Sequence, residues 1–337
     1  MSASPAVRVL IPATLDELPP IPALDAVVWS LHGTTMGTQW RVHLVPTAVA
    51  DRRQIDVTIQ AALDRVVLQM STWLPHSELC RFNAAPAGAE MQLSPEFADV
   101  LRSALELARD SGGAYDPTAA PLVDLWGFGP APRVQVVPSE AAISAARAVV
   151  GWQRLPFDPV TRHVMQPGGL RLDLSAIAKG HGVDLVCAAL RAHGIEHFLV
   201  EVGGELRGRG CKPDGLPWWV ALEHAQEEIS APVRIALHGL AVASSGDAFQ
   251  HFTVNGRRYS HTLDPRSGWP VSNVLAGVTV LHRECMWADA LATAIYVLGA
   301  DAGFQYAHDR DLAARLVLRT TDGLRERLTP AFAAMLA

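Results

Sequence analysis

The chain has 337 residues, of which 49% are hydrophobic and 18% are charged, and its formal net charge is −6. This composition is typical of an ordered globular protein and excludes a mainly disordered one. An acidic balance without a basic block argues against a nucleic-acid partner and against a polybasic contact with a membrane surface. A chain of this length buries a large core, as one domain or as two intimate lobes.

The N-terminal segment is rich in proline and has no secretory signal. Prolines at positions 12, 19, 20 and 22 predict an extended lead-in over residues 1–26, followed by one folded domain over residues 27–337. The apolar stretch from Val7 to Ile11 is too short for a signal peptide, and acidic residues follow it. No run of about 18 apolar residues occurs, so we expect no membrane span and a cytoplasmic location.

The cysteines lie far apart and show no C-x-x-C spacing. We therefore expect free thiols and neither a structural zinc site nor a disulfide framework. The residues concerned are Cys80, Cys187, Cys211 and Cys285.

The first half of the chain predicts a hairpin followed by two helices. Residues 27–45 read as two strands around the turn GTTMGT. Apolar residues at helical spacing predict a helix over 52–70. Ser94 as N-cap and Pro95 at the first position start a second helix, which Gly112 and Gly113 end.

The second half alternates strands with two helices. RLDL (171–174) reads as a strand, Ser175 as the N-cap of a helix that runs to about His193, and HFLVEVGG (197–204) as the next strand. Consecutive strands with short turns, and helices in separate blocks, favour the α+β class: a largely antiparallel or mixed sheet with flanking helices. The remaining expected elements are strands at 218–223, 233–237, 241–244, 252–260 and 275–281, and a last helix at about 286–298.

Two loop segments have the residue types of a ligand site. In SGGAYDPTAAPLVDLWGFG (111–129), a glycine pair shapes a loop that can approach a ligand closely, although an ordinary turn after a helix would look similar. In LDLSAIAKGHGVD (172–184), a helix N-terminus together with Lys179 would suit a phosphate group. A capped helix with a solvated lysine is the competing interpretation.

A third segment and a fourth add groups that can transfer protons or bind metals. His261 lies three residues before Asp264 in a turn, where it could shuttle a proton or simply complete the turn. In MWADALATAIYVLG (286–299), Asp289 and Thr293 share one helical face, and their oxygens suit Mg²⁺. The alternative is that Asp289 only favours the first turn of a helix. The glycine pattern GGELRGRG (203–210) leads into CKPDG and not into a helix, so it fails the context of a dinucleotide-binding loop.

Several segments, taken in order, resemble the motifs of one family, the ApbE-like flavin transferases (FAD:protein FMN transferases). The resemblance runs from about Gly33 to Gly299, and its specificity comes from the order of motifs that are individually modest. It implies that residues 27–337 form a single ApbE-like catalytic domain. The matching stretches are MGT, MSTWLPHSELCRFN, AYDPTAAPLVDLWGFG, LDLSAIAKG, VEVGGELRGRG, SSGD, SHTLDPRSGWP and ADALATA.

The resemblance implies an Mg²⁺-dependent reaction on FAD. A threonine or serine hydroxyl of an acceptor flavoprotein attacks the phosphorus of the FMN half, AMP leaves, and FMN stays attached through a phosphoester. The implied metal ligands are the side chains of Asp289 and Thr293 and the backbone carbonyl of Ala176, and the candidates for the catalytic base are Asp289 and His261. The implied FAD contacts are Met36, Trp73, Ala114, Tyr115, Asp116, Asp173, Lys179 and Thr262.

Two other functions use the same site. One is an Mg²⁺-dependent FAD pyrophosphatase, in which water replaces the acceptor and the products are FMN and AMP. The other is an FAD-binding carrier without turnover. The pair of Asp289 and Thr293 argues against the carrier, because a pure binder needs no metal beside the pyrophosphate.

Overall fold

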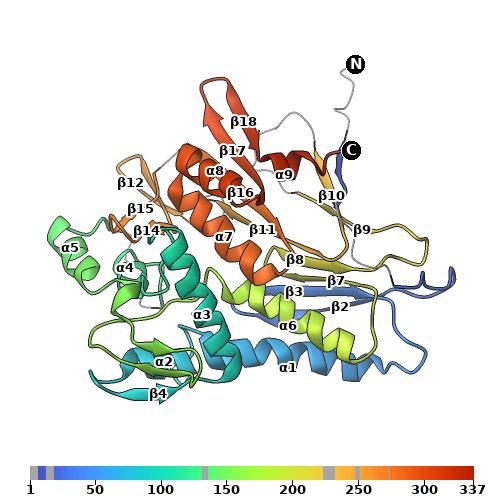
Figure 1. Cartoon of the computed structure of the whole chain (residues 1–337), viewed down its shortest axis with the longest axis horizontal. Coiled ribbons are helices and arrows are strands. Elements are labelled where there is room, and N and C mark those ends of the chain that lie inside the picture. Colours follow the sequence, from blue (N-terminus) through green and yellow to red (C-terminus); the bar gives the residue numbers. More distant parts are fainter. Residues whose placement is uncertain (1–6, 13–18, 131–135, 223–231, 247–250, 273) are drawn as a thin grey trace.

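The centre of the molecule is an eight-stranded antiparallel sheet (Figure 1). The computed structural model describes residues 7–12, 19–130, 136–222, 232–246, 251–272 and 274–337. The sheet order is β18-β17-β16-β11-β8-β7-β3-β2, so the hairpin β2–β3 and the hairpin β17–β18 form its two opposite edges. The strands are β2 (Trp29–Thr35), β3 (Thr38–Leu44), β7 (Phe198–Val202), β8 (Glu205–Arg209), β11 (Leu240–Gly246), β16 (Leu275–His282), β17 (Ala313–Thr320) and β18 (Gly323–Leu328).

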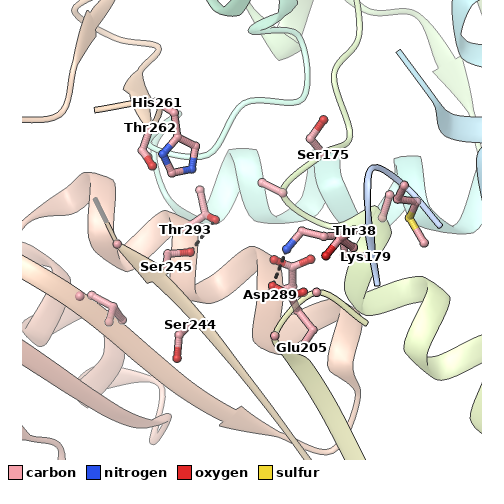
Figure 2. A pocket seen from close by; sticks show the side chains of 18 of the residues that line it. Thr38, Ser175, Lys179, Glu205, Ser244, Ser245, His261, Thr262, Asp289 and Thr293 are labelled. Carbon is pink, nitrogen blue, oxygen red and sulfur yellow. Dashed lines mark hydrogen bonds and ion pairs between the residues drawn. The ribbon is translucent and has the colours of Figure 1, made fainter. Parts of the chain in front are cut away.

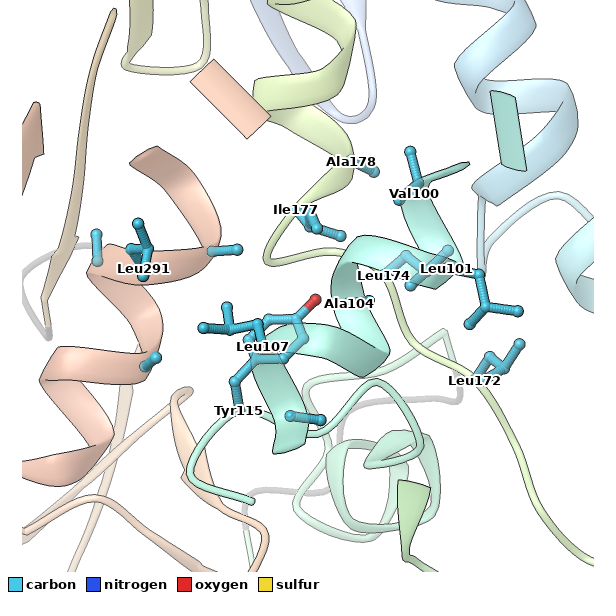
Figure 3. Packing of buried hydrophobic residues seen from close by; sticks show 14 of the residues in the cluster. Val100, Leu101, Ala104, Leu107, Tyr115, Leu172, Leu174, Ile177, Ala178 and Leu291 are labelled. Atoms are coloured by element: carbon cyan, nitrogen blue, oxygen red, sulfur yellow. The ribbon is translucent and has the colours of Figure 1, made fainter. Parts of the chain in front are cut away.

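Helices cover one face of this sheet (Figure 1). The buried stripe of α1 (Arg52–Met70) packs with α6 (Ala178–Ala192) against β2, β3 and β7, and the Asp51 side chain caps α1 by accepting the N–H of Gln54 at 2.8 Å. The alanine-rich helix α7 (Cys285–Leu298) is buried on most of its surface, lying between the sheet, α3 (Pro95–Asp110) and α8 (Ala300–Asp309). Figure 3 shows Leu101, Leu107 and Ile177 in the layer where α3 meets the chain before α6.

A small sheet covers the opposite face. It consists of β1 (Arg8–Leu10), β10 (Val233–Leu237) and β9 (Trp218–Ala221), and β1 runs parallel to β10. Leu10 and Ile235 pack with Val242 of β11 and with Phe332 of the short helix α9 (Pro330–Ala333). The N-terminal segment was expected to be extended without packing; β1 departs from this because its strand edge and Leu10 find partners more than 200 residues away in sequence.

The remaining elements are short, and α4, β12, β13 and β14 among them contribute residues to the cavity described below. An aromatic cluster of Trp126, Phe252 and Tyr259 joins the segment after α3 to the β12–β13 hairpin. The elements not yet given are α2 (Glu78–Ala84), β4 (Glu90–Gln92), α4 (Ala120–Leu125), α5 (Glu140–Ala148), the 3-10 turn Trp152–Arg154, β5 (Phe157–Asp158), β6 (His163–Met165), β12 (His251–Val254), β13 (Arg257–Ser260), β14 (Leu263–Asp264) and β15 (Trp269–Pro270).

The α+β class and most expected elements are confirmed, and the differences have local causes. The stretch 171–174 is not a strand, and α6 starts at Ala178 and not after Ser175, because the Asp173 side chain accepts the Ser175 N–H at 2.8 Å and folds the chain into a turn. The residues expected as one strand at 252–260 form the β12–β13 hairpin, and α8 and α9 follow the helix expected to be the last. The strand expected to reach Glu223 ends at Ala221; Glu223 lies outside the described residues. The division into two lobes stays a prediction.

The four cysteines are free, as expected from their spacing. Among the helices that the structure describes, none is long and apolar enough to cross a membrane.

Candidate active site

A cavity of about 2030 Å³ lies where the sheet, α6, α7 and the segment after α3 meet (Figure 2). Its volume exceeds the range of roughly 300–1,000 Å³ that is usual for small-molecule sites. The structure brings all the predicted site residues to its lining: Met36, Trp73, Ala114, Tyr115, Asp116, Asp173, Ala176, Lys179, His261, Thr262, Asp289 and Thr293.

Helix α7 presents a buried carboxylate and a hydroxyl to this cavity. Asp289 is only 4% exposed, and its Oδ2 accepts the backbone N–H of Gly180 at 3.1 Å. Burial raises the pKa of Asp289, while Lys179 and the Gly180 N–H act to lower it. One turn further along, the Thr293 hydroxyl lies 3.0 Å from the hydroxyl of Ser245 on β11. The shared helical face predicted from the spacing therefore points into the cavity.

Lys179 forms an ion pair with Glu205 of β8. Burial disfavours the charge on Lys179, but the carboxylates of Asp289 and Glu205 together raise its pKa. Burial raises the pKa of Glu205 to about 7, against the opposing effect of Lys179. The solvated lysine considered from the sequence is therefore excluded.

Glu205 is the main site residue that the sequence analysis missed. It stands in GGELRGRG, a stretch assessed only for dinucleotide binding. Its side chain is 4% exposed, and Oε2 is buried without a hydrogen-bond partner among the described residues. A carboxylate at the start of a strand after two glycines was the available signal, but its partner lies 26 positions earlier in the chain.

The loop after α3 is shaped by its backbone, as expected. Gly112 and Gly113 have φ angles of 60° and 80°, which glycine adopts without strain. Asp116 organises the loop by accepting the N–H and hydroxyl of Thr118 and the N–H of Trp152. Burial raises the pKa of Asp116, and these hydrogen bonds act to lower it. Tyr115 places a buried hydroxyl at the cavity, with no partner within the part of the chain that the structure describes.

The stretch before α6 contributes a turn and not a helix cap. Asp173 holds Ser175 and Ala176 at the cavity wall through its bond to the Ser175 N–H, and burial raises the pKa of Asp173. Ser175 was expected to cap the helix. The N-cap residue is instead Ile177, which has no side-chain cap.

Three predicted residues line the cavity from loops and not from α6 or α7. Trp73 is 61% exposed in the loop between α1 and α2, where its backbone N–H donates to the Ser71 hydroxyl at 3.1 Å. His261 and Thr262 connect β13 to β14, and the His261 ring meets the edge of Phe128 at a centroid distance of 6.3 Å. Asp264, considered as a partner of His261, pairs with Arg266. Asp247 of the SSGD motif lies outside the described residues.

Asp184 of α6 fixes the start of α7. Helix α7 has no side-chain cap of its own, and the Asp184 carboxylate replaces it by accepting the N–H groups of Cys285 at 3.0 Å and Met286 at 2.9 Å. The same carboxylate binds Arg207 of β8 at 2.5 Å. The two helices that provide Lys179 and Asp289 are thus tied together beside the cavity.

Asp184→Ala is expected to lower the free energy of unfolding by about 2–4 kcal/mol, because it leaves two N–H groups and a partly buried guanidinium without their acceptor. Urea denaturation of the purified variant measures this change. The matched control is Asp99→Ala on the surface of α3, expected to stay within about 0.5 kcal/mol of the unsubstituted chain. Equal losses in both variants would refute a bracing role for Asp184.

The donor atoms at the cavity fit Mg²⁺. Asp289 and Thr293 supply carboxylate and hydroxyl oxygens, and Ala176 lines the same cavity. In the described ranges no group of three or more histidine, cysteine, aspartate or glutamate side chains gathers to hold a metal. A site with few protein ligands and hard oxygen donors is what Mg²⁺ prefers, because Mg²⁺ keeps several waters or substrate phosphates.

Comparisons with known proteins show similarity over nearly the whole chain. The FAD:protein FMN transferase of Vibrio cholerae is 38% identical over 304 residues, covering 90% of this chain and 91% of that protein. That of Haemophilus influenzae is 36% identical, with 91% of each chain covered. The crystal structure of the Pseudomonas stutzeri flavinyl transferase ApbE, in its apo form, matches with a TM-score of 0.86 and 39% identity, covering 92% of this chain and 97% of that one.

These relatives and the solved structure belong to one class of proteins, the flavin transferases. The model of the ApbE family matches residues 36–316. The chain therefore belongs to the ApbE family, and the resemblance seen in its motifs is confirmed.

Proposed function

We propose that this flavin transferase of the ApbE family uses Mg²⁺ to transfer FMN from FAD to a threonine or serine hydroxyl of an acceptor flavoprotein, with release of AMP. The observation that carries the proposal is the convergence of Asp289, Thr293 and Lys179 on one cavity. Transfer of a phosphate group from a pyrophosphate needs mainly positioning and neutralisation of charge, which these groups can supply.

The roles of the residues follow from their chemistry. Asp289, Thr293 and the carbonyl of Ala176 would hold Mg²⁺, which when bound neutralises charge on the pyrophosphate. Lys179 adds a positive charge beside Asp289, and the exposed Trp73 offers an aromatic face at the rim. Met36, Ala114, Asp116, Asp173 and Thr262 line the same cavity and are proposed FAD contacts.

The reaction itself moves one proton and exchanges one bond at phosphorus. The acceptor hydroxyl oxygen forms a bond to the phosphorus of the FMN half, and the bond from that phosphorus to the bridging oxygen breaks. AMP leaves with that oxygen, and a base takes the hydroxyl proton. Asp289 and His261, both at the cavity, are the proposed candidates for this base.

Tyr115→Phe is expected to stabilise the ligand-free protein by about 1 kcal/mol, because it removes a buried hydroxyl that has no partner among the described residues. The same change should weaken FAD binding by about tenfold if the hydroxyl serves the ligand. Urea denaturation and quenching of flavin fluorescence measure the two effects. Tyr306→Phe is the control with the opposite sign, because the Tyr306 hydroxyl bonds to Asp110 at 2.5 Å and its loss should destabilise. A Tyr115→Phe protein that is less stable and binds FAD normally would contradict the assignment.

One experiment separates the proposal from its two alternatives. The protein is incubated with FAD, Mg²⁺ and an acceptor flavoprotein, and both AMP release and the mass of the acceptor are measured. AMP with a gain of FMN mass supports the transferase, and AMP alone supports a pyrophosphatase. Absence of both products supports an FAD carrier. The cytoplasmic location expected from the sequence stays a prediction.

A further inference from the structure

Two buried carboxylates stand near a single ammonium group at the cavity. Lys179 forms its ion pair with Glu205, although Asp289 also raises its pKa and therefore lies within electrostatic reach. The Asp289 carboxylate accepts a backbone N–H from Gly180. Figure 2 shows the three side chains gathered at one end of the pocket, with Thr293 farther along α7 and Ser245 of β11 beside it. The lysine thus has two possible partners and pairs with the one on the sheet.

The position of Glu205 is fixed by the hairpin that carries it. Strands β7 and β8 are joined through Gly203 and Gly204, whose φ angles are 60° and 104°, and Glu205 pairs with Val202 at the first position of the ladder. The Cβ of any other residue at Gly203 would lie 2.8 Å from the Thr38 side chain. The turn therefore requires glycine at position 203, and the buried Glu205 side chain that follows it reaches Lys179.

A contribution to stability does not by itself explain a glutamate at position 205. Its Oε2 is buried and has no hydrogen-bond partner among the described residues, and burial of an unsatisfied polar oxygen is costly. The Lys179 side of the ion pair is partly exposed to solvent, which limits the contribution of the pair to the stability of the fold. A functional reason for this carboxylate is therefore needed.

We propose that Glu205 is a positioning residue that holds the Lys179 ammonium and so leaves the Asp289 carboxylate open to Mg²⁺. A partly buried ammonium that loses its partner turns to the nearest remaining carboxylate, because opposite charges at the wall of a protein cavity attract each other more strongly than they do in bulk water. That carboxylate is Asp289, so Lys179 and Mg²⁺ would compete for it. This inference rests on the proposed function, since it takes Asp289 as a ligand of Mg²⁺.

Glu205→Gln tests the proposal by removing the charge and keeping the shape. We expect Mg²⁺ affinity, measured by titration calorimetry with Mg²⁺ alone, to fall by about 10- to 100-fold. The double variant Glu205→Gln with Lys179→Met should regain most of this loss, because the competing ammonium is gone. If Glu205 were itself a ligand, the double variant would stay as weak as the single one, and the proposal would be overturned.

The matched control is Glu201→Gln on the adjacent strand β7. Glu201 also lines the cavity and is half-buried, with Arg41 at 3.7 Å, so its loss removes the same charge from the same region. We expect less than about a threefold change in Mg²⁺ affinity there. An equal fall in both variants would show a general effect of charge and would overturn the positioning role.

Further variants keep the outcome decisive. If Glu205→Gln does not fold, Glu205→Asp keeps the charge and shortens the side chain, and it should retain more Mg²⁺ affinity than Glu205→Ala. If the unsubstituted protein binds Mg²⁺ and Glu205→Gln binds it equally well, the inference is overturned and the proposed function still stands. A wild type that binds no Mg²⁺, with or without FAD, overturns the proposed function and this inference together.

Discussion

Asp289→Asn should lower FMN transfer by at least about 10³-fold and leave the folded protein nearly as stable as before. The asparagine oxygen can still accept the Gly180 N–H, so the local hydrogen bond survives. The charge that would hold Mg²⁺ is lost. Because burial already raises the pKa of Asp289, removing its charge relieves an unfavourable desolvation, and we expect the free energy of unfolding to change by less than about 1 kcal/mol.

AMP release and acceptor mass measure the transfer, and titration calorimetry measures Mg²⁺ affinity. Chelation of Mg²⁺ from the unsubstituted enzyme should produce a similar loss, reversed when Mg²⁺ is added back. Asp301→Asn is the control, because Asp301 is a fully solvated aspartate in the first turn of α8 and is paired with Arg327. Full transfer activity in Asp289→Asn would remove the basis of the proposed metal site.

Gly180→Ala is expected to lower the free energy of unfolding by about 2–3 kcal/mol. A Cβ at this position would lie 2.3 Å from the carbonyl oxygen of Cys285 and 2.8 Å from the Cα of Met286. Both atoms belong to the backbone at the start of α7, so no side-chain rotation relieves the overlap. Helices α6 and α7 would have to separate, which also pulls the Gly180 N–H from Asp289. We therefore expect weaker Mg²⁺ binding as well.

Gly182→Ala on the same helix is the matched control. A Cβ there would meet the terminal methyl of Met36 at 2.9 Å and a methyl of Leu63 at 3.3 Å, and flexible side chains can yield. The helix propensity of alanine favours the change, so we expect the free energy of unfolding to shift by less than about 1 kcal/mol. Urea denaturation of both variants decides the matter. Similar stabilities would show that the close approach of α6 to α7 tolerates a methyl group.

The elements that local patterns could predict are those stabilised by local contacts. Helix α1 begins and ends where the apolar spacing places it, at Arg52 and Met70, because one stripe of side chains faces one sheet. The start of α6 was predicted wrongly because two local signals compete. Ser175 resembles an N-cap, but Asp173 takes its N–H first, and the helix begins three residues later.

The candidate site was predicted as a set of residues but not as an arrangement. Asp289 and Thr293 share a helical face by spacing alone, and the structure confirms that this face lines the cavity. The ordering of β8 between β7 and β11 brings Glu205 to Lys179, and no pattern within either segment specifies that pairing. The brace from Asp184 to the start of α7 spans about 100 residues and was invisible for the same reason.

The amino-acid sequence therefore determined the α+β class, most helix and strand positions, the family and the groups proposed to act in the reaction, because periodicity, turn residues and motifs are properties of short segments. The tertiary structure alone decided which of these groups share a cavity, which carboxylate pairs with Lys179, and where the N-terminal strand packs. These outcomes depend on contacts between distant segments. Each such contact is selected by the burial and pairing of the whole chain and not by local preference.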